Sequence, residues 1–175
     1  MASAFSHGWH PPVNFAFVDM VRESNRIEGI ERDPTEAEIS EFQRFLKLDR
    51  LEVSELLHFV SVNQPGAVLR DRIGLDVRVG THYPLKGGPH IAAMLERLLD
   101  AINAKDINAW QAHCIYEWLH PFTDGNGRSG RVIWYWSQNR SATHMLDYGF
   151  LRGFYYQTLS QGGTEEMRRC LGWEL

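Results

Sequence analysis

Residues 120–131 form a short stretch that must end one helix and begin the next. They read His-Pro-Phe-Thr-Asp-Gly-Asn-Gly-Arg-Ser-Gly-Arg. Because Pro121 disfavours a helical conformation at the residue before it, a helix arriving from the N-terminal side should end at His120. A helical apolar pattern resumes at Val132. The segment 125–128 is therefore predicted at a helix N-terminus, where N–H groups without intrahelical partners attract phosphate.

The same stretch supplies the groups of a cationic phosphate cradle. Gly125 and Gly127 carry no Cβ, so the backbone can turn there and approach a ligand closely. Arg128 and Arg131 lie three positions apart on the expected helix and share a face. Two permanent cations beside such N–H groups suit a polyphosphate better than a single carboxylate.

Two further side chains fit the chemistry of phosphate transfer. Asp124 is one hard anionic ligand next to the expected phosphates, which is how Mg²⁺ is usually held. His120 titrates near neutral pH and could take a proton from an incoming hydroxyl. Together these residues predict in-line attack on a nucleotide phosphate.

The stretch resembles the active-site motif of the Fic family, His-Pro-Phe-x-(Asp/Glu)-Gly-Asn-Gly-Arg-x-x-Arg, and every fixed position is filled. The resemblance implies an all-helical enzyme that transfers AMP from ATP to a hydroxyl side chain of a target protein. It implies His120 as general base and Asp124 as the Mg²⁺ ligand. It implies Phe122 as the anchor of the nucleotide-binding loop. The anion hole would be formed by Gly125, Asn126 and Gly127, and the outer phosphates would be bound by Arg128 and Arg131.

Other interpretations of this stretch are weaker. Residues 125–130 also satisfy the dinucleotide-binding pattern Gly-x-Gly-x-x-Gly, but that pattern follows a strand, and residues 107–119 carry a helical stripe. A purely structural His-Pro turn does not explain the aspartate, the amide and the arginines together. A catalytic zinc site at His120 and Asp124 needs a third ligand. We expect His113 to be a structural histidine of the helix instead, with its hydrogen bonds made within the fold.

A second informative pattern lies in residues 15–29. Four residues there follow helical spacing: Val18, Val21, Asn25 and Glu28. Glu28 therefore points from the side that docks the helix, and it needs a cationic partner because burying an unpaired charge is costly. Gly29 is a natural helix stop.

Residues 24–29, Ser-Asn-Arg-Ile-Glu-Gly, resemble the inhibitory motif of the Fic family, (Ser/Thr)-x-x-x-Glu-(Gly/Asn). In the subclass that carries this motif ahead of the active site, the glutamate pairs with the second motif arginine, here Arg131. The resemblance implies regulatory roles for Ser24, Glu28 and Gly29. It also implies that ATP binds with its α-phosphate out of line for attack by the hydroxyl. A capping or surface glutamate is the alternative.

Residues 75–90 are predicted to form a short strand followed by a loop or loose hairpin. Leu75, Val77 and Val79 alternate with polar residues, and glycines and prolines follow. In the Fic family a β-hairpin flap at this position pairs with the target chain as an added strand. The docking residues would be Val77, Arg78, Val79, Gly80 and Thr81. An ordinary connecting hairpin is the alternative.

The whole chain is therefore expected to be a mainly α, compact helical domain of Fic type with a short β-hairpin flap. We expect an irregular arm over residues 1–14 and a single domain over residues 15–175, with final helices at residues 154–159 and through Trp173. Residues 144–149 replace the proline-containing segment common in the family. If they help to form the base pocket, the donor could be UTP, GTP or a diphosphate-linked nucleotide in place of ATP.

Composition limits the partners and the compartment. The net charge of −4 argues against a nucleic-acid surface. No apolar run is long enough to cross a membrane. Cys114 and Cys170 make neither a metal spacing nor a disulfide framework, which fits a reducing cytoplasm.

The sequence therefore predicts an ATP- and Mg²⁺-dependent protein adenylyltransferase that is inhibited by its own Glu28. Its partner would be a target protein with a hydroxyl side chain, and self-modification is possible. Two other functions stay open. One is removal of AMP by water that Glu28 orients, and the other is a catalytically silent nucleotide-binding module of a toxin–antitoxin system.

Overall fold

The computed structural model describes residues 13–80 and 83–138, with side chains from residue 18 onward, and these residues are mainly helical. The described residues contain six helices: α1 (Val13–Ile27), α2 (Glu36–Leu46), α3 (Val53–Asn63), α4 (Pro89–Ala104), α5 (Ala109–Leu119) and α6 (Asn126–Ser137). The prediction of a mainly α fold is confirmed. The expected arm up to residue 12 and the expected final helices lie outside the described residues, and α1 already includes residues 13 and 14.

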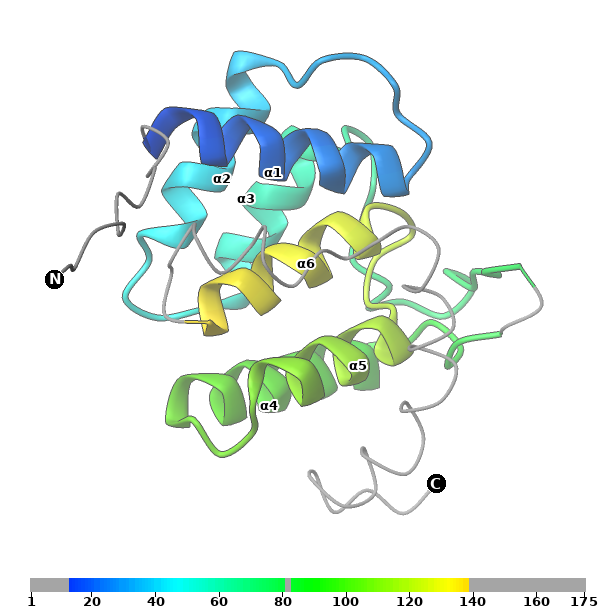
Figure 1. The fold of residues 1–175 in the computed structure, drawn as a ribbon. Helices are drawn as coiled ribbons and strands as arrows, with labels where there is room; N and C mark the ends of the chain where they lie inside the picture. Colours follow the sequence, from blue (N-terminus) through cyan, green and yellow to red (C-terminus); the bar gives the residue numbers. More distant parts are fainter. Residues whose placement is uncertain (1–12, 81–82, 139–175) are drawn as a thin grey trace, which may run out of the picture.

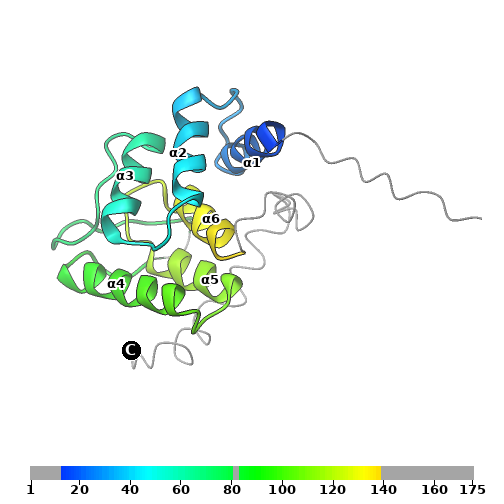
Figure 2. The same cartoon turned by 90° about the vertical axis from the view of Figure 1, so that its left-hand side faces the viewer.

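Helix α6 lies at the centre of the fold, between two layers of helices (Figure 1). It contacts α1, α2 and α3 on one side and α5 on the other. Helix α4 packs beside α5 and also contacts α3 (Figure 2). None of the described helices is both long enough and apolar enough to cross a bilayer.

The apolar surface of α6 explains its central place. Val132 and Ile133 are fully buried, and Trp134 and Tyr135 are 5 % exposed. A helix with apolar residues on all sides must be covered on all sides, which explains why α6 lies between the two layers.

Helices α5 and α6 approach each other closely at Gly130. A Cβ at this position would lie 3.0 Å from Cδ1 of Tyr116 on α5. One residue earlier, the Ser129 hydroxyl lies 2.7 Å from the Tyr116 hydroxyl, and both groups are buried. Two of the three positions that the active-site motif leaves free, Ser129 and Gly130, therefore hold α6 against α5.

Glu38 is a buried carboxylate that fixes the start of α2. Its carboxylate accepts a hydrogen bond from the Thr35 N–H at 2.7 Å, and the Thr35 hydroxyl accepts one from the Glu38 N–H at 3.2 Å. Arg32 donates to both carboxylate oxygens at 2.8 Å. Burial by itself raises the pKa of Glu38, but the hydrogen bonds from Arg32 and Thr35 outweigh burial and lower the pKa to about 2.

The strand predicted at residues 75–79 is absent, and the described residues contain no β-hairpin flap. Polar side chains of this segment bind main-chain groups nearby. The Asp76 carboxylate accepts from the Gly87 N–H at 2.8 Å, and Arg78 Nε donates to the Gly80 carbonyl at 2.6 Å. Residues 75–80 and 83–86 contain neither a helix nor a named strand, and they project from the helices as the two arms of a loop (Figure 1).

Replacing Glu38 with Gln should lower the free energy of unfolding by about 1–3 kcal/mol at neutral pH, because hydrogen bonds to a charged group are lost. The folded pKa of Glu38 is lowered from 4.5 to about 2, so its contribution is fully present above about 4.5 and is lost as the pH falls towards 2. The difference between wild type and variant, measured by denaturant unfolding, should therefore shrink across this pH window.

Glu36→Gln is the matched control, because Glu36 is an exposed carboxylate in the first turn of the same helix. It should change the stability by less than about 0.5 kcal/mol. A stability difference for Glu38→Gln that stays constant down to the low end of the window would contradict the role given to this carboxylate.

Candidate active site

The predicted site lies in the turn between α5 and α6. Helix α5 ends at Leu119, and His120 caps it with φ 48° and ψ 60°, in the left-handed region. Helix α6 begins at Asn126 after Gly125, which is also left-handed with φ 77°. No side chain of the described residues caps the N-terminus of α6. The expected helix stop at His-Pro and the expected helix start in Gly-Asn-Gly-Arg are both present, so the turn offers N–H groups to an anion.

Phe122 and Asn126 hold this turn in shape. Phe122 is fully buried, as expected for the anchor of the loop. The Asn126 amide donates to the Phe122 carbonyl and accepts from the Phe122 N–H, both at 2.8 Å. The Asn126 side chain thus closes the loop, although the sequence had suggested only a place in the anion hole.

Arg128 is buried and faces the C-terminal end of α3. Its guanidinium donates to the Asn63 carbonyl at 2.5 Å and to the Gln64 side-chain oxygen. A carboxylate oxygen of Glu38 lies 4.0 Å from its Nη1. Burial lowers the pKa of Arg128, and the carboxylates around it oppose this shift.

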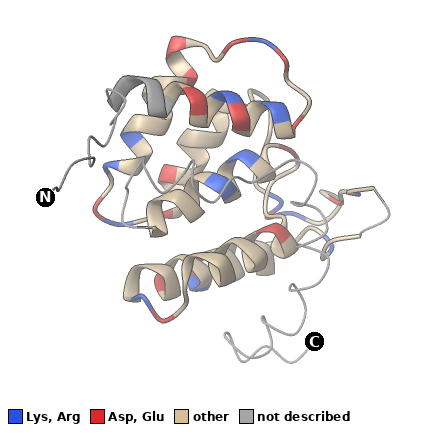
Figure 3. Ribbon diagram, in the orientation of Figure 1, with Lys and Arg blue, Asp and Glu red and all other residues tan. Residues whose placement is uncertain are grey.

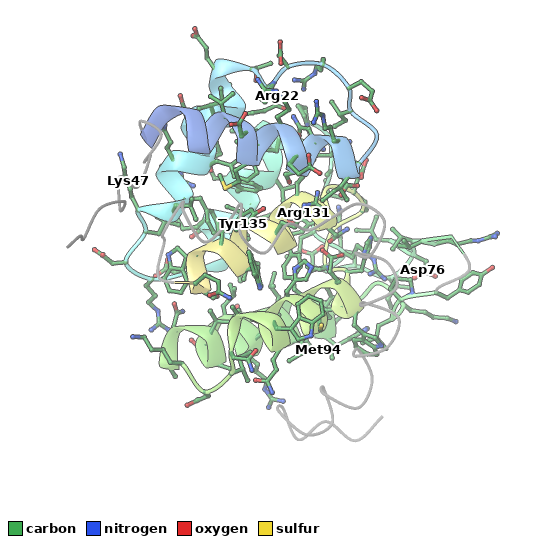
Figure 4. The ribbon with its side chains drawn as sticks, viewed as in Figure 1. Arg22, Lys47, Asp76, Met94, Arg131 and Tyr135 are labelled. Carbon is green, nitrogen blue, oxygen red and sulfur yellow. The ribbon has the colours of Figure 1, made fainter. Side chains whose placement is uncertain are left out.

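Arg131 is fully buried and faces α1 (Figure 4). Its Nη2 donates to Glu28 Oε1 at 2.7 Å and to the Ser24 carbonyl at 2.8 Å. Its Nε donates to the Ser24 hydroxyl at 3.0 Å. The contact between Glu28 and Arg131, expected from the two separate motifs, is therefore present. The two arginines of α6 lie in its N-terminal half (Figure 3), but they are bound to different helices.

The Glu28 carboxylate rests on the first turn of α6. A Cβ added to Gly127 would collide with Glu28 Oε1 and would lie 3.1 Å from Arg131 Nη1. The positive end of the helix dipole and the Arg131 guanidinium both stabilise a negative charge there. The Glu28 side chain is 32 % exposed, whereas that of Arg131 is 0 % exposed. A carboxylate thus lies where the sequence predicts a phosphate.

Gly29 lets the chain leave α1 directly after Glu28. It adopts φ 78°, a conformation that few other residues accept. The Ile30 N–H then donates back to the Asn25 carbonyl at 3.0 Å, which closes the end of the helix.

Asp124 is exposed at the rim of the turn and is linked to Arg128 through Gln64. Its carboxylate accepts from the Gly125 N–H at 2.7 Å and from the Gln64 amide at 2.6 Å. The same amide group of Gln64 accepts from Arg128. A single exposed carboxylate beside an anion site fits Mg²⁺, whose other ligands would be phosphate oxygens and water.

The histidines differ in their surroundings. His120 is half-buried at the turn, where its backbone N–H donates to the Tyr116 carbonyl at 2.9 Å. His113 is fully buried, and burial lowers its pKa to about 3, so it stays neutral at neutral pH. Among the described residues, no group of three His, Cys, Asp or Glu side chains could hold a metal, so the zinc interpretation lacks its third ligand there.

The expected docking residues 77–80 lie in the projecting loop, and Thr81 lies outside the described residues. Arg78 lies over the ring of Tyr83, with 5.6 Å between its Cζ and the ring centroid. Tyr83 is 69 % exposed, so this part of the loop presents aromatic surface to solvent.

Gln64 and Arg70 lie in the site region although no sequence pattern points to them. Gln64 follows α3 and precedes Pro65, and it carries no pattern that distinguishes it from an ordinary loop residue. Arg70 is a fully buried cation in a segment without regular structure. Both act through contacts with residues about fifty or more positions away, which no local pattern reports.

A comparison with curated proteins gives no match. A profile of the Fic/DOC family matches residues 35–137, which is more than half of the chain. The matched range contains α2 to α6 and the whole turn over residues 120–131, whereas α1 and Glu28 lie before it. The chain belongs to the Fic/DOC family.

Proposed function

We propose that this protein is a nucleotidyltransferase that transfers AMP from ATP to a Tyr, Thr or Ser hydroxyl of a target protein. The family to which the chain belongs is generally related to the transfer of nucleotide-derived groups to proteins. The observation that carries the proposal is the uncapped N-terminus of α6, where Gly127 and Arg131 hold the Glu28 carboxylate and Arg128 lies one position further along the helix. The same surroundings suit the outer phosphates of a nucleotide.

The reaction would use the turn as follows. The target hydroxyl oxygen attacks the α-phosphorus of ATP, and His120 accepts the hydroxyl proton. The bond from the α-phosphorus to the bridging oxygen breaks, and pyrophosphate leaves. Arg128, Arg131 and the N–H groups of α6 stabilise the charge that develops on it. Mg²⁺ held by Asp124 would neutralise phosphate charge when it is bound.

Glu28 would inhibit this reaction by competing with the outer phosphate. In the structure its carboxylate is bound to Arg131 and lies against Gly127. A phosphate cannot use the same donors at the same time. ATP would then bind with its α-phosphate out of line until Glu28 moves away.

A second reaction, removal of AMP from a modified target, is favoured by the exposure of Glu28. Its side chain is 32 % exposed beside the anion site, so it could orient a water molecule there. Incubating a modified target with the wild-type protein separates the two reactions, because only AMP removal restores the unmodified mass.

The Glu28→Gly variant should modify itself or a target with a nucleotide monophosphate, because Arg131 becomes available to the outer phosphate. Intact-mass spectrometry after incubation with Mg²⁺ and each nucleoside triphosphate in turn measures this adduct and also names the base. We expect at least a tenfold increase over the wild type, which corresponds to about 1.4 kcal/mol.

Glu28→Gly/His120→Ala is the control for this experiment, and it should give no adduct. Equal adducts on the wild type and on Glu28→Gly would remove the inhibitory role of Glu28. Tight nucleotide binding without any adduct, on the chain itself or on proteins of a lysate, would favour the silent binding module.

Ser24→Ala should release part of the inhibition. It removes the hydroxyl that accepts from Arg131 Nε and leaves the Glu28 contact in place. Loss of this one charged hydrogen bond should raise adduct formation about 3- to 10-fold, to a level below that of Glu28→Gly. Ser40→Ala, at an exposed position of α2, should have no effect. Activity of Ser24→Ala equal to that of the wild type would exclude a contribution of this hydroxyl.

Asp124→Asn in the Glu28→Gly background should raise the Mg²⁺ concentration needed for half-maximal transfer about tenfold or more, because a carboxylate ligand is lost. Chelation of Mg²⁺ should abolish transfer by the parent variant. A Mg²⁺ titration of adduct formation measures both effects. An unchanged titration curve would assign the metal to another ligand.

A further inference from the structure

Arg70 joins the projecting loop to the turn that carries His120. It follows α3 in the chain and is fully buried. Its guanidinium donates to four backbone carbonyls from two distant parts of the chain: Leu75 at 2.8 Å, Leu85, Leu119 at 3.4 Å and His120 at 2.6 Å. The first two belong to the two arms of the loop, and the last two belong to the end of α5.

The backbone of Arg70 makes the same connection. Its N–H donates to the Pro121 carbonyl at 2.8 Å, and its carbonyl accepts from the Gly88 N–H at 2.9 Å. Leu69 and Phe122, the neighbours in each segment, form an isolated antiparallel bridge. The loop and the His-Pro turn are therefore linked at one residue by both main chain and side chain.

A buried arginine is suited to joining several segments. Burying its charge is costly unless many hydrogen bonds compensate for the lost water. Burial lowers the pKa of the Arg70 guanidinium, and the nearby Asp76 carboxylate opposes the shift. The planar guanidinium presents donors in several fixed directions, so it can bind carbonyls of separate segments at once. A lysine ammonium has fewer donors and no fixed fork, and it would leave some of these carbonyls without a partner.

The contact with His120 is the one that bears on chemistry. His120 has a positive φ, which is uncommon for a residue other than glycine. The hydrogen bond from Arg70 to its carbonyl holds the peptide in this conformation. A displacement of about 1 Å in a reacting group can cost about 10²-fold in rate.

We propose that Arg70 is a positioning residue that sets His120 for proton transfer and couples it to the loop arms over residues 75–80 and 83–86. The proposal rests on the proposed function, because it takes His120 as the general base. Whatever fixes the loop, such as a bound target chain, would then also fix the base.

Arg70→Lys and Arg70→Gln in the Glu28→Gly background test the catalytic part. Each should lower kcat at least tenfold while the Kd for ATP changes less than twofold, because the arginines of α6 do not contact Arg70. Arg72→Lys is the matched control, since the Arg72 side chain is 73 % exposed, and it should change neither value. A parallel loss of kcat and ATP binding, or an unchanged kcat, would overturn the proposal.

Amide hydrogen exchange tests the coupling without any transfer reaction. In both Arg70 variants, exchange should rise about tenfold or more in residues 83–88 and 120–123 together, and it should stay unchanged in α2. A rise in only one segment would overturn the coupling. Unfolding of both variants would also overturn it, because Arg70 would then support the whole domain. Absence of transfer in the parent Glu28→Gly would count against the proposed function and leave this measurement intact.

Discussion

The burial of the Arg131 guanidinium is the constraint on which the arrangement of α1 and α6 depends. A cation without exposure to solvent is stable only when charged or polar groups satisfy it. Ser24 and Glu28 supply those groups from α1. The helix that docks on α6 is therefore held there partly by the same cation that would bind a phosphate. In the function proposed here, stability and inhibition would depend on one interaction, so a ligand that binds Arg131 would also loosen α1.

Other side chains link the remaining parts of the turn to one another. Asn126 closes the loop through Phe122, and Gln64 links Asp124 to Arg128. Both of these side chains lie at a helix end, Asn126 at the start of α6 and Gln64 at the end of α3. The main chain of the turn is thus held in shape, and the Glu28 carboxylate lies against the start of α6.

Local chemistry explains which parts of the site could be predicted from the sequence. Pro121 and Gly125 act on the residues next to them, so the end of α5 and the start of α6 were predicted correctly. The helical period placed Glu28 on the docking face, and the cost of a buried charge called for a cationic partner. These inferences need only spacing, backbone preferences and electrostatics, whereas Arg131 was named as that partner by the resemblance to the inhibitory motif.

Features that depend on long-range contacts could not be predicted in this way. The alternating residues 75–79 suggested a strand, but no strand is present there, and the Asp76 and Arg78 side chains bind main-chain groups of Gly87 and Gly80. Gln64 and Arg70 gain their roles only when segments far apart in the chain meet. A side chain that satisfies distant carbonyls leaves no periodic signal in the sequence.

Calorimetric titration of ATP and of AMP into the wild type and Glu28→Gly tests most directly whether Glu28 and the outer phosphate compete for Arg131. Both proteins should bind AMP with the same affinity, because AMP lacks the outer phosphates. ATP should bind Glu28→Gly at least about tenfold more tightly than it binds the wild type. Equal gains for ATP and AMP, or no gain for ATP, would contradict a competition between this carboxylate and the outer phosphate.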